Sequence, residues 1–244
     1  MPVIFELQKR GVRFGLNSNR AWEDVEPIIE RFHLNGPFIL ENGAYFKETA
    51  TAEPVLCADL LVNIPQMVFD TLLQVIHENF SDADLHKVDT TKIILDSELV
   101  SNGQHFYLNA FRKFSASLHH RFDHTKTFAV AEKLACELNK VFISEKIQLQ
   151  AQAHVHGATV TVEIPGVNKG TGILFLKNRY PEVKFVAIGD GVGDVVMRDF
   201  VSELYAVSNA IPELKEVANF TASLPFTQGV KEILENFFFD NNKK

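Results

Sequence analysis

The sequence of 244 residues predicts an α/β protein with a doubly wound, Rossmann-like parallel sheet and an inserted α+β domain. Two observations lead to this prediction. Short apolar strands alternate with amphipathic helices towards both ends of the sequence, which is the pattern of a doubly wound sheet. Residues 47–165 break this alternation with longer helical patterns and with strands of alternating polarity, which are typical of an antiparallel sheet with one buried face.

The first 46 residues contain two helical patterns and two strand patterns. The first helix ends in Lys9 and Arg10, and Gly11 follows as a C-cap. The strand VRFGL, the helix AWEDVEPIIERFHL and a strand within GPFILENGAYF come next, with short connections between them. This is the opening of an α/β sheet.

Residues 166–244 return to the same alternation. The predicted elements are the helix GTGILFLKNRY, the strand VKFVAIGD, a helix over 195–202, the strand LYAVSN, the helix PELKEVA, the strand FTAS and the helix GVKEILENFF. We therefore expect residues 1–46 and 166–244 to form one core domain and residues 47–165 to form an inserted cap domain.

The predicted cap combines helices with alternating strands. Its helices are PQMVFDTLLQVIHENF and TFAVAEKLACELNKVF, and its strands include IQLQAQAHVHG and ATVTVEI. His154 and His156 would share one face of a strand, and His120 and His124 would lie one turn apart if SASLHHRFDH is helical. Two interpretations follow: a zinc site of four histidines, or histidines that face solvent or substrate.

Charge and hydropathy exclude several classes of partner. The net charge is -7 and the isoelectric point about 5.7, so there is no diffuse basic surface for a nucleic acid. No apolar run approaches the roughly 20 residues that span a bilayer. The first ten residues, MPVIFELQKR, lack the features of a secretion signal. We expect a cytoplasmic protein that binds neither nucleic acid nor membrane.

The turn AIGDGVGDVVM places Asp190 and Asp194 where a buried strand passes into a helix. Ligands bind at such strand ends in open α/β sheets. A dinucleotide fingerprint would need glycine at the position of Asp194, and a calcium loop would need an oxygen ligand where Val192 stands. A carboxylate pair that holds Mg²⁺ fits the spacing, and so does a plain turn with Asp194 as the helix N-cap.

Two further turns carry groups that suit a phosphate. In LNSNR, the Ser18 hydroxyl and the backbone amides of Asn19 and Arg20 lie at a helix N-terminus, which favours anion binding, although Ser18 or Asn19 could simply cap the helix. In VNKGTGILFL, Lys169 begins a helix, where the helix dipole disfavours a cation unless an anion is near. The alternative there is a solvated lysine.

Taken together and in this order, these stretches resemble the haloacid dehalogenase superfamily of phosphatases, in particular its Cof-like members with a large cap inserted after the third strand. The resemblance covers both core segments nearly throughout. The matching pieces are SNR, ENGAYF, VNKGTGI, GDGVGDVVM and AVSNAIPELKEVANFTASLPFTQGVKEIL.

The resemblance implies a Mg²⁺-dependent phosphatase that acts on a small phosphorylated metabolite, such as a sugar phosphate or phosphoglycolate. Ser18 would hydrogen-bond the phosphoryl group and Lys169 would neutralise its charge. Asp190 would bind Mg²⁺, and Asp194 would support the metal or position Lys169. Asn42, in the segment ENG, would lie beside the same pocket.

The sequence departs from the family pattern in two places. Gly193 stands where asparagine commonly precedes the last aspartate, and the nucleophile motif D-x-D-G-T is absent. Neither Asp96 nor Asp240 has the context of that motif. We expect a misplaced start codon, a truncated gene or an alternative product, and a chain without turnover whose sheet has open edges where a central strand is missing. The alternative is a catalytically silent relative that binds a phosphometabolite or a protein partner.

Overall fold

The computed structural model describes residues 2–58, 63–81, 83–89, 105–121, 127–154 and 159–239. Asp96, Asp240, His124 and His156 lie outside these residues. The chain divides into two compact units: unit 1 comprises Met1–Arg20, Val25–Ala58 and Val167–Lys244, and unit 2 comprises Ala21–Asp24 and Asp59–Gly166.

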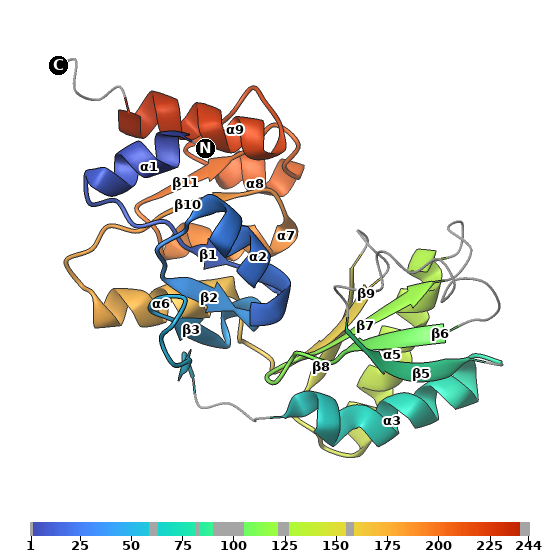
Figure 1. Ribbon diagram of the computed structural model, residues 1–244. Coiled ribbons are helices and arrows are strands. Elements are labelled where there is room, and N and C mark those ends of the chain that lie inside the picture. The colour runs from blue at the N-terminus through green and yellow to red at the C-terminus, as the bar shows by residue number, and fades with distance from the viewer. Residues whose placement is uncertain are drawn as a thin grey trace. The chain divides into compact units, whose positions relative to one another are not determined.

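Unit 1 is an alternation of helices and short strands, as Figure 1 shows. Its N-terminal elements are α1 (Pro2–Lys9), β1 (Leu16–Asn17), α2 (Trp22–Phe32), β2 (Phe38–Leu40), the 3-10 turn η1 (Glu41–Gly43), β3 (Tyr45–Lys47) and β4 (Val55–Leu56). Its C-terminal elements are α6 (Lys169–Arg179), β10 (Val186–Gly189), α7 (Val192–Val195), η3 (Val196–Asp199), β11 (Glu203–Ala206), α8 (Pro212–Val217), β12 (Phe220–Thr221), α9 (Phe226–Leu234) and the π-helical turn η4 (Glu235–Phe239).

The strands of unit 1 form two separate sheets in the part of the chain that the structure describes. One sheet has the order β1-β2-β3-β4, in which β1 and β2 are parallel and β3 and β4 add antiparallel strands. The other has the order β10-β11-β12 and is entirely parallel. The predicted α/β class is confirmed. The sequence pattern did not indicate that β3 and β4 would add antiparallel strands to the first sheet.

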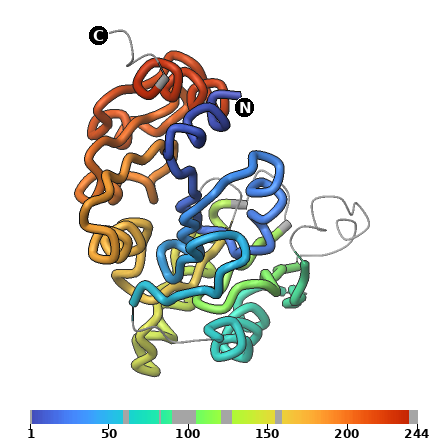
Figure 2. The backbone as a smooth tube through the Cα atoms, turned by 60° about the vertical axis from the view of Figure 1, so that its left-hand side comes forward, coloured from blue at the N-terminus to red at the C-terminus, as the bar shows by residue number. Residues whose placement is uncertain are grey.

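In the described part of unit 1, two clusters of buried side chains hold the elements together. The larger cluster joins the two sheets, because Ile39 and Phe46 of the first sheet pack with Leu204 of the second and with Ile173 of α6. The smaller one joins α1 to Leu234 of α9. Figure 2 shows α1, in dark blue, beside the red C-terminal helix.

In its described residues, unit 2 is a five-stranded sheet with two helices packed on one face. Its elements are α3 (Ile64–Asn79), β5 (Asp84–Val88), β6 (His105–Asn109), β7 (Ala116–Arg121), α5 (Thr127–Ser144), β8 (Gln150–His154) and β9 (Thr159–Glu163). The strand order is β5-β6-β7-β9-β8; among these described strands β5 and β6 pair in parallel and the other neighbours pair antiparallel. Both helices and the mainly antiparallel sheet agree with the predicted α+β character.

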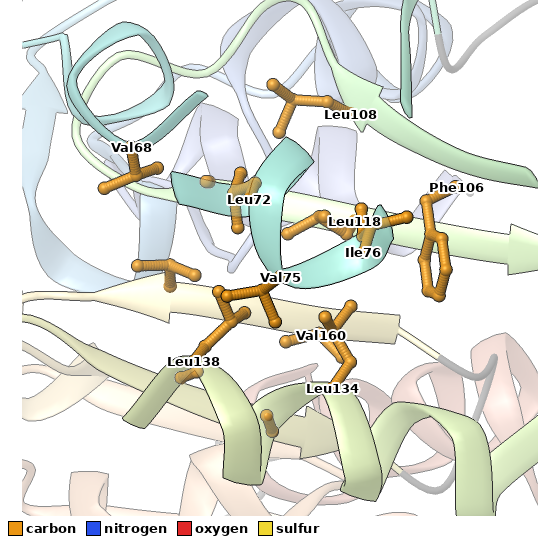
Figure 3. Packing of buried hydrophobic residues seen from close by; sticks show 14 of the residues in the cluster. Val68, Leu72, Val75, Ile76, Phe106, Leu108, Leu118, Leu134, Leu138 and Val160 are labelled. Atoms are coloured by element: carbon orange, nitrogen blue, oxygen red, sulfur yellow. The ribbon is translucent and has the colours of Figure 1, made fainter. Parts of the chain in front are cut away.

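A single apolar core lies between this sheet and its helices. Leu72 of α3 and Leu138 of α5 are fully buried and converge on Leu118 and Val160 of the sheet, as Figure 3 shows. Because side chains alternate along a strand, the opposite face of the sheet carries polar residues. On that face His119 lies next to Thr159, whose hydroxyl is 3.2 Å from Nδ1 of the histidine ring.

The segment SASLHHRFDH contains strand β7, so the helix considered for it is wrong. His120 is buried on the helix-covered face, with its ring 5.7 Å from that of Phe106. His154 lies on the other face, where its Nε2 is 2.8 Å from the Thr161 hydroxyl. These two histidines therefore cannot share a zinc ion, and the described residues contain no group of three or more histidine, cysteine or acidic side chains that could hold a metal.

Burial lowers the pKa of His154, so the polar face of the sheet carries an imidazole that resists protonation.

Among the helices described, none combines the length and the apolar character needed to cross a bilayer.

Candidate functional site

Four turns of unit 1, all singled out in the sequence, meet at the carboxyl ends of its strands. They are the turn after β1, the turn η1 after β2, the start of α6 and the turn between β10 and α7. Hydrogen bonds connect them in series: η1 binds the backbone of Ser18, Asn17 binds Lys169, Lys169 binds Asp194, and Asp194 binds the backbone of Asp190. The structure therefore brings Ser18, Asn42, Lys169, Asp190 and Asp194 into one network.

The turn after β1 is held by a backbone hydrogen bond to β2 and by the side chain of Ser18. The Ser18 N–H donates to the carbonyl of Ile39 at 2.9 Å, which continues the pairing with β2. The Ser18 hydroxyl oxygen accepts a hydrogen bond from the backbone N–H of Arg20 at 3.2 Å. That N–H is therefore not free to bind an anion, whereas the hydroxyl proton of Ser18 remains a donor. Asn19 is half-buried, and the Arg20 side chain is exposed.

The turn η1 fixes the position of Ser18 by an unusual backbone conformation. Glu41, Asn42 and Gly43 all have positive φ angles, of 43°, 59° and 95°. Consecutive left-handed residues cost free energy and persist only where the surroundings determine them. Here the N–H of Asn42 donates to the carbonyl of Ser18 at 3.1 Å. This backbone hydrogen bond holds Asn42 beside Ser18.

Gly43 connects η1 to the start of α6. A Cβ atom on Gly43 would lie 1.9 Å from the carbonyl oxygen of Asn168, so only glycine allows this approach. Asn168 is the N-cap of α6: its side chain accepts hydrogen bonds from the N–H groups of Gly170 and Thr171, and Thr171 Oγ1 accepts one from the N–H of Asn168. This capping box satisfies the first turn of the helix.

Lys169 is the first residue of α6, and its cation has a partner in the protein. Its Nζ is 2.5 Å from Oδ1 of Asp194, and the Asp194 side chain is only 6% exposed. The carboxylate supplies the anion that offsets the unfavourable helix dipole at this position. Its other oxygen, Oδ2, accepts hydrogen bonds from the N–H groups of Asp190 and Gly191 at 2.8 and 2.9 Å. Asp194 therefore orients Lys169 and closes the turn that carries Asp190.

Two glycines in this turn differ in what surrounds them. A Cβ atom on Gly189 would lie 2.6 Å from Cβ of Asp194, so this position has no space for a side chain. A Cβ atom on Gly193 would meet only Cε of Lys169, at 3.9 Å, which is ordinary contact. Gly193 therefore leaves room beside the lysine, whereas Gly189 is required for the carboxylate of Asp194 to fit.

The carboxylate of Asp190 is the exposed acidic group of the network. Mg²⁺ is commonly held by one or two carboxylates together with waters and phosphate oxygens, so Asp190 has the chemistry for a direct ligand. Both oxygens of Asp194 are already engaged, which suits a role in orienting its neighbours. An ammonium group, a hydroxyl donor and an exposed carboxylate at one edge can together bind a phosphoryl group and a divalent cation.

Asn17 is the residue of this network that the sequence did not single out. Its Nδ2 donates to the backbone carbonyl of Lys169 at 3.0 Å, so it ties the end of β1 to the start of α6. The sequence feature that could have identified it is a polar residue at the end of an otherwise apolar strand, in FGLNSN. The left-handed backbone of η1 was also not predicted, because Glu41 is a residue type that rarely adopts a positive φ angle.

The family described as haloacid dehalogenase-like hydrolase matches residues 2–234. A phosphoglycolate phosphatase of Methanothrix thermoacetophila is 30% identical over 38% of this chain and 42% of that protein. Phosphoglycolate phosphatase 2 of Saccharolobus solfataricus is 30% identical over 42% of this chain and 45% of that protein. The aligned parts thus span less than half the length of each of these two relatives.

A longer alignment joins the chain to the stress response protein YhaX of Bacillus subtilis, at 22% identity over 99% of this chain and 87% of that protein. A solved structure of a haloacid dehalogenase-like hydrolase from Bacteroides thetaiotaomicron superimposes with a TM-score of 0.71 at 17% identity, covering 97% of this chain and 91% of that one. The protein TM0651 of Thermotoga maritima gives 0.66 at 19% identity, covering 95% and 87%.

These structures share the fold, and the family match runs through every turn of the network described above. The chain belongs to the haloacid dehalogenase-like hydrolase family.

Proposed function

We propose that the network of Ser18, Lys169, Asp190 and Asp194 is the phosphoryl-binding half of a Mg²⁺-dependent phosphatase for a small phosphorylated metabolite. The observation that carries the proposal is the Lys169–Asp194 pair at 2.5 Å, held beside the exposed carboxylate of Asp190. The match to the haloacid dehalogenase-like hydrolase family supports the same activity.

Each residue has a separate task in this proposal. The Ser18 hydroxyl and the Lys169 ammonium bind the oxygens of the phosphoryl group, and Asp194 keeps the ammonium aimed at them. Asn19 and Arg20 border the same anion, and Asn42 holds the Ser18 turn in place through its backbone. Asp190 holds Mg²⁺, which supplies neutralising charge to the phosphate when it is bound.

Hydrolysis in this proposal needs a carboxylate nucleophile that attacks phosphorus while the ester P–O bond breaks and the leaving oxygen takes a proton. Water then attacks the acyl phosphate, releasing inorganic phosphate and restoring the carboxylate. The sequence of 244 residues has no D-x-D-G-T motif to supply that nucleophile. We infer that this chain by itself binds phosphate and phosphate esters without turning them over.

Binding is the first test. Isothermal titration of the chain with inorganic phosphate in the presence of Mg²⁺ should show saturable binding that Asp190→Ala and Lys169→Met each weaken at least about tenfold. Asp199→Ala changes another exposed carboxylate in η3 and should leave the affinity unchanged. Equal affinity in all four proteins would reject the site.

Turnover is the second test. A version extended at its N-terminus by an apolar strand that ends in D-x-D-G-T should hydrolyse p-nitrophenyl phosphate with Mg²⁺, and Asp190→Ala should abolish this activity. Clear turnover by the unextended chain would show that its nucleophile lies elsewhere. Phosphate binding without any turnover in the extended version would favour the silent relative that binds a phosphometabolite.

The substrate class follows from the relatives that are named phosphoglycolate phosphatases. We propose a small phosphomonoester such as phosphoglycolate or a sugar phosphate. Measuring the kcat/KM of the extended version for each ester of such a panel ranks the esters as substrates. A preference for large polymeric substrates over every small ester would contradict the proposal.

A further inference from the structure

Phe226 is a large apolar side chain that is 67% exposed at the start of α9. Its backbone has a φ angle of 50°, in the left-handed region that bulky residues rarely adopt. Such strain persists only where the surrounding structure determines it, and it is concentrated at functional sites. Neither burial nor backbone preference therefore explains a phenylalanine at this position.

The loop that carries Phe226 is fixed by side chains from two other segments. The carboxylate of Glu232 accepts hydrogen bonds from the N–H and hydroxyl of Ser223 and from the N–H of Leu224, at 2.9–3.1 Å. The N–H of Phe226 itself donates to Oδ1 of Asn209 at 2.7 Å. The exposed ring is therefore carried by an anchored loop.

The segment that follows β11 connects this loop to the phosphoryl site. The N–H of Ser208 donates to the carbonyl of Leu224 at 3.1 Å. Three residues later, the N–H of Ile211 donates to the carbonyl of Asp190 at 3.0 Å. Because β10 and β12 are both neighbours of β11, they lie about 10 Å apart. Phe226 and Asp190 therefore lie at the carboxyl edge of one parallel sheet, where such sheets bind ligands.

A second exposed apolar side chain lies next to the same carboxylate. Val192, two residues after Asp190 and at the start of α7, is also 67% exposed. A phosphoryl group, which is charged, gains nothing from apolar neighbours. The leaving group of an ester, by contrast, can remove their apolar surface from water.

We propose that Phe226 and Val192 form an apolar rim of the phosphoryl site, which selects phosphomonoesters whose leaving group has an apolar ring face. The ring of Phe226 would stack on that face. This inference rests on the proposed function, because Ser18, Lys169 and Asp190 must first bind the phosphoryl group. Among small phosphomonoesters, the rim favours the ester of a ring alcohol over phosphoglycolate, whose leaving group is short and charged.

The test is isothermal titration of the chain, with Mg²⁺ present, against inorganic phosphate, phosphoglycolate and phenyl phosphate. Phenyl phosphate should bind about five- to tenfold more tightly than either of the other two ligands. Phe226→Ala should remove this difference, and Phe226→Tyr, which keeps a ring, should retain it. Phe5→Ala removes another exposed phenyl ring, on α1, and should change none of the three affinities.

The three ligands separate failure of the rim from failure of the site. Equal binding of phenyl phosphate and inorganic phosphate, tighter binding of phosphoglycolate, or equal weakening of all three by Phe226→Ala would overturn the rim and leave the phosphoryl site in place. No saturable binding of any ligand would reject the site and the rim together. A change in sedimentation coefficient in Phe226→Ala, with the affinity for phenyl phosphate unchanged, would also overturn the rim, because the ring would then serve a contact between copies of this chain.

Discussion

In the residues that the structure describes, unit 2 has one continuous sheet over one apolar core, whereas unit 1 has two sheets that an apolar cluster joins and turns that a few polar contacts connect. In unit 2 every strand contributes alternate side chains to the same layer. In unit 1 the turns are joined by single hydrogen bonds such as Asn17 to Lys169. A core with regular periodicity therefore specifies the fold of unit 2, whereas individual contacts position the turns of unit 1.

The largest effect is expected in the core of unit 2. Phe106 is 0% exposed, and its ring lies 5.2 Å from that of Phe80. Phe106→Ala should lower the free energy of unfolding by about 3–5 kcal/mol, because it removes buried apolar area and leaves a cavity. Urea denaturation followed by circular dichroism measures this loss. Met67→Ala, on the 51% exposed Met67 of α3, is the control and should change stability by less than about 0.5 kcal/mol. Similar losses in the two variants would contradict a single tightly packed core.

The next largest effect is expected at the Lys169–Asp194 ion pair of unit 1. Asp194→Asn leaves the Lys169 ammonium, whose side chain is 17% exposed, without its anion and weakens the hydrogen bonds from the turn. We expect a loss of about 2–3 kcal/mol, below the value for a fully buried pair because water reaches the lysine. Thermal unfolding compares this variant with Asp199→Asn, an exposed carboxylate that should matter little. An unchanged melting temperature for Asp194→Asn would show that the pair is not formed.

A smaller and more local effect separates two glycines of the same turn. Gly189→Ala should cost about 1–3 kcal/mol because the added methyl group would overlap Cβ of Asp194. Gly193→Ala adds the same methyl group where the nearest atom is 3.9 Å away, so its stability should stay within about 0.5 kcal/mol. Amide exchange of the backbone N–H groups of Asp190 and Gly191 reports whether the turn has opened. Equal behaviour of the two variants would mean that Asp194 does not close the turn as described.

The smallest effect depends on pH. Glu48 loses some hydration on burial, which raises its pKa, but hydrogen bonds from Tyr180 and Arg13 outweigh this and lower the pKa overall. A lowered pKa means that ionised Glu48 stabilises the fold above the ordinary pKa of about 4.5 and that this contribution disappears on acidification. Glu48→Gln should therefore cost less than about 1 kcal/mol at pH 7 and nothing near pH 3. Melting temperatures across this range, with exposed Glu53→Gln as control, measure it; a cost that grows in acid would contradict the assignment.

The sequence predicted the parts of the molecule that repeat regularly. Helical periodicity identified α3, α5 and α6. The turns of Ser18 and Lys169 were identified because these residues lie at helix starts, and the turn of Asp190 by its glycines and aspartates. It could not reveal that β7 is a strand, because HHR carries no alternation of apolar and polar residues. The residues alone did not pair Lys169 with Asp194, which lies 25 positions away, but the family resemblance offered this pairing as one of two roles for Asp194.

Unit 1 is assembled from two stretches of sequence that are separated by more than a hundred residues, whereas unit 2 is nearly continuous. During synthesis, unit 2 can close its core as soon as residue 166 has left the ribosome, but residues 1–58 must wait for residues 167–234 before their apolar side chains are covered. This high contact order predicts that unit 1 forms later and more slowly than unit 2. Chaperone dependence should therefore concentrate in unit 1, which carries the proposed phosphoryl site.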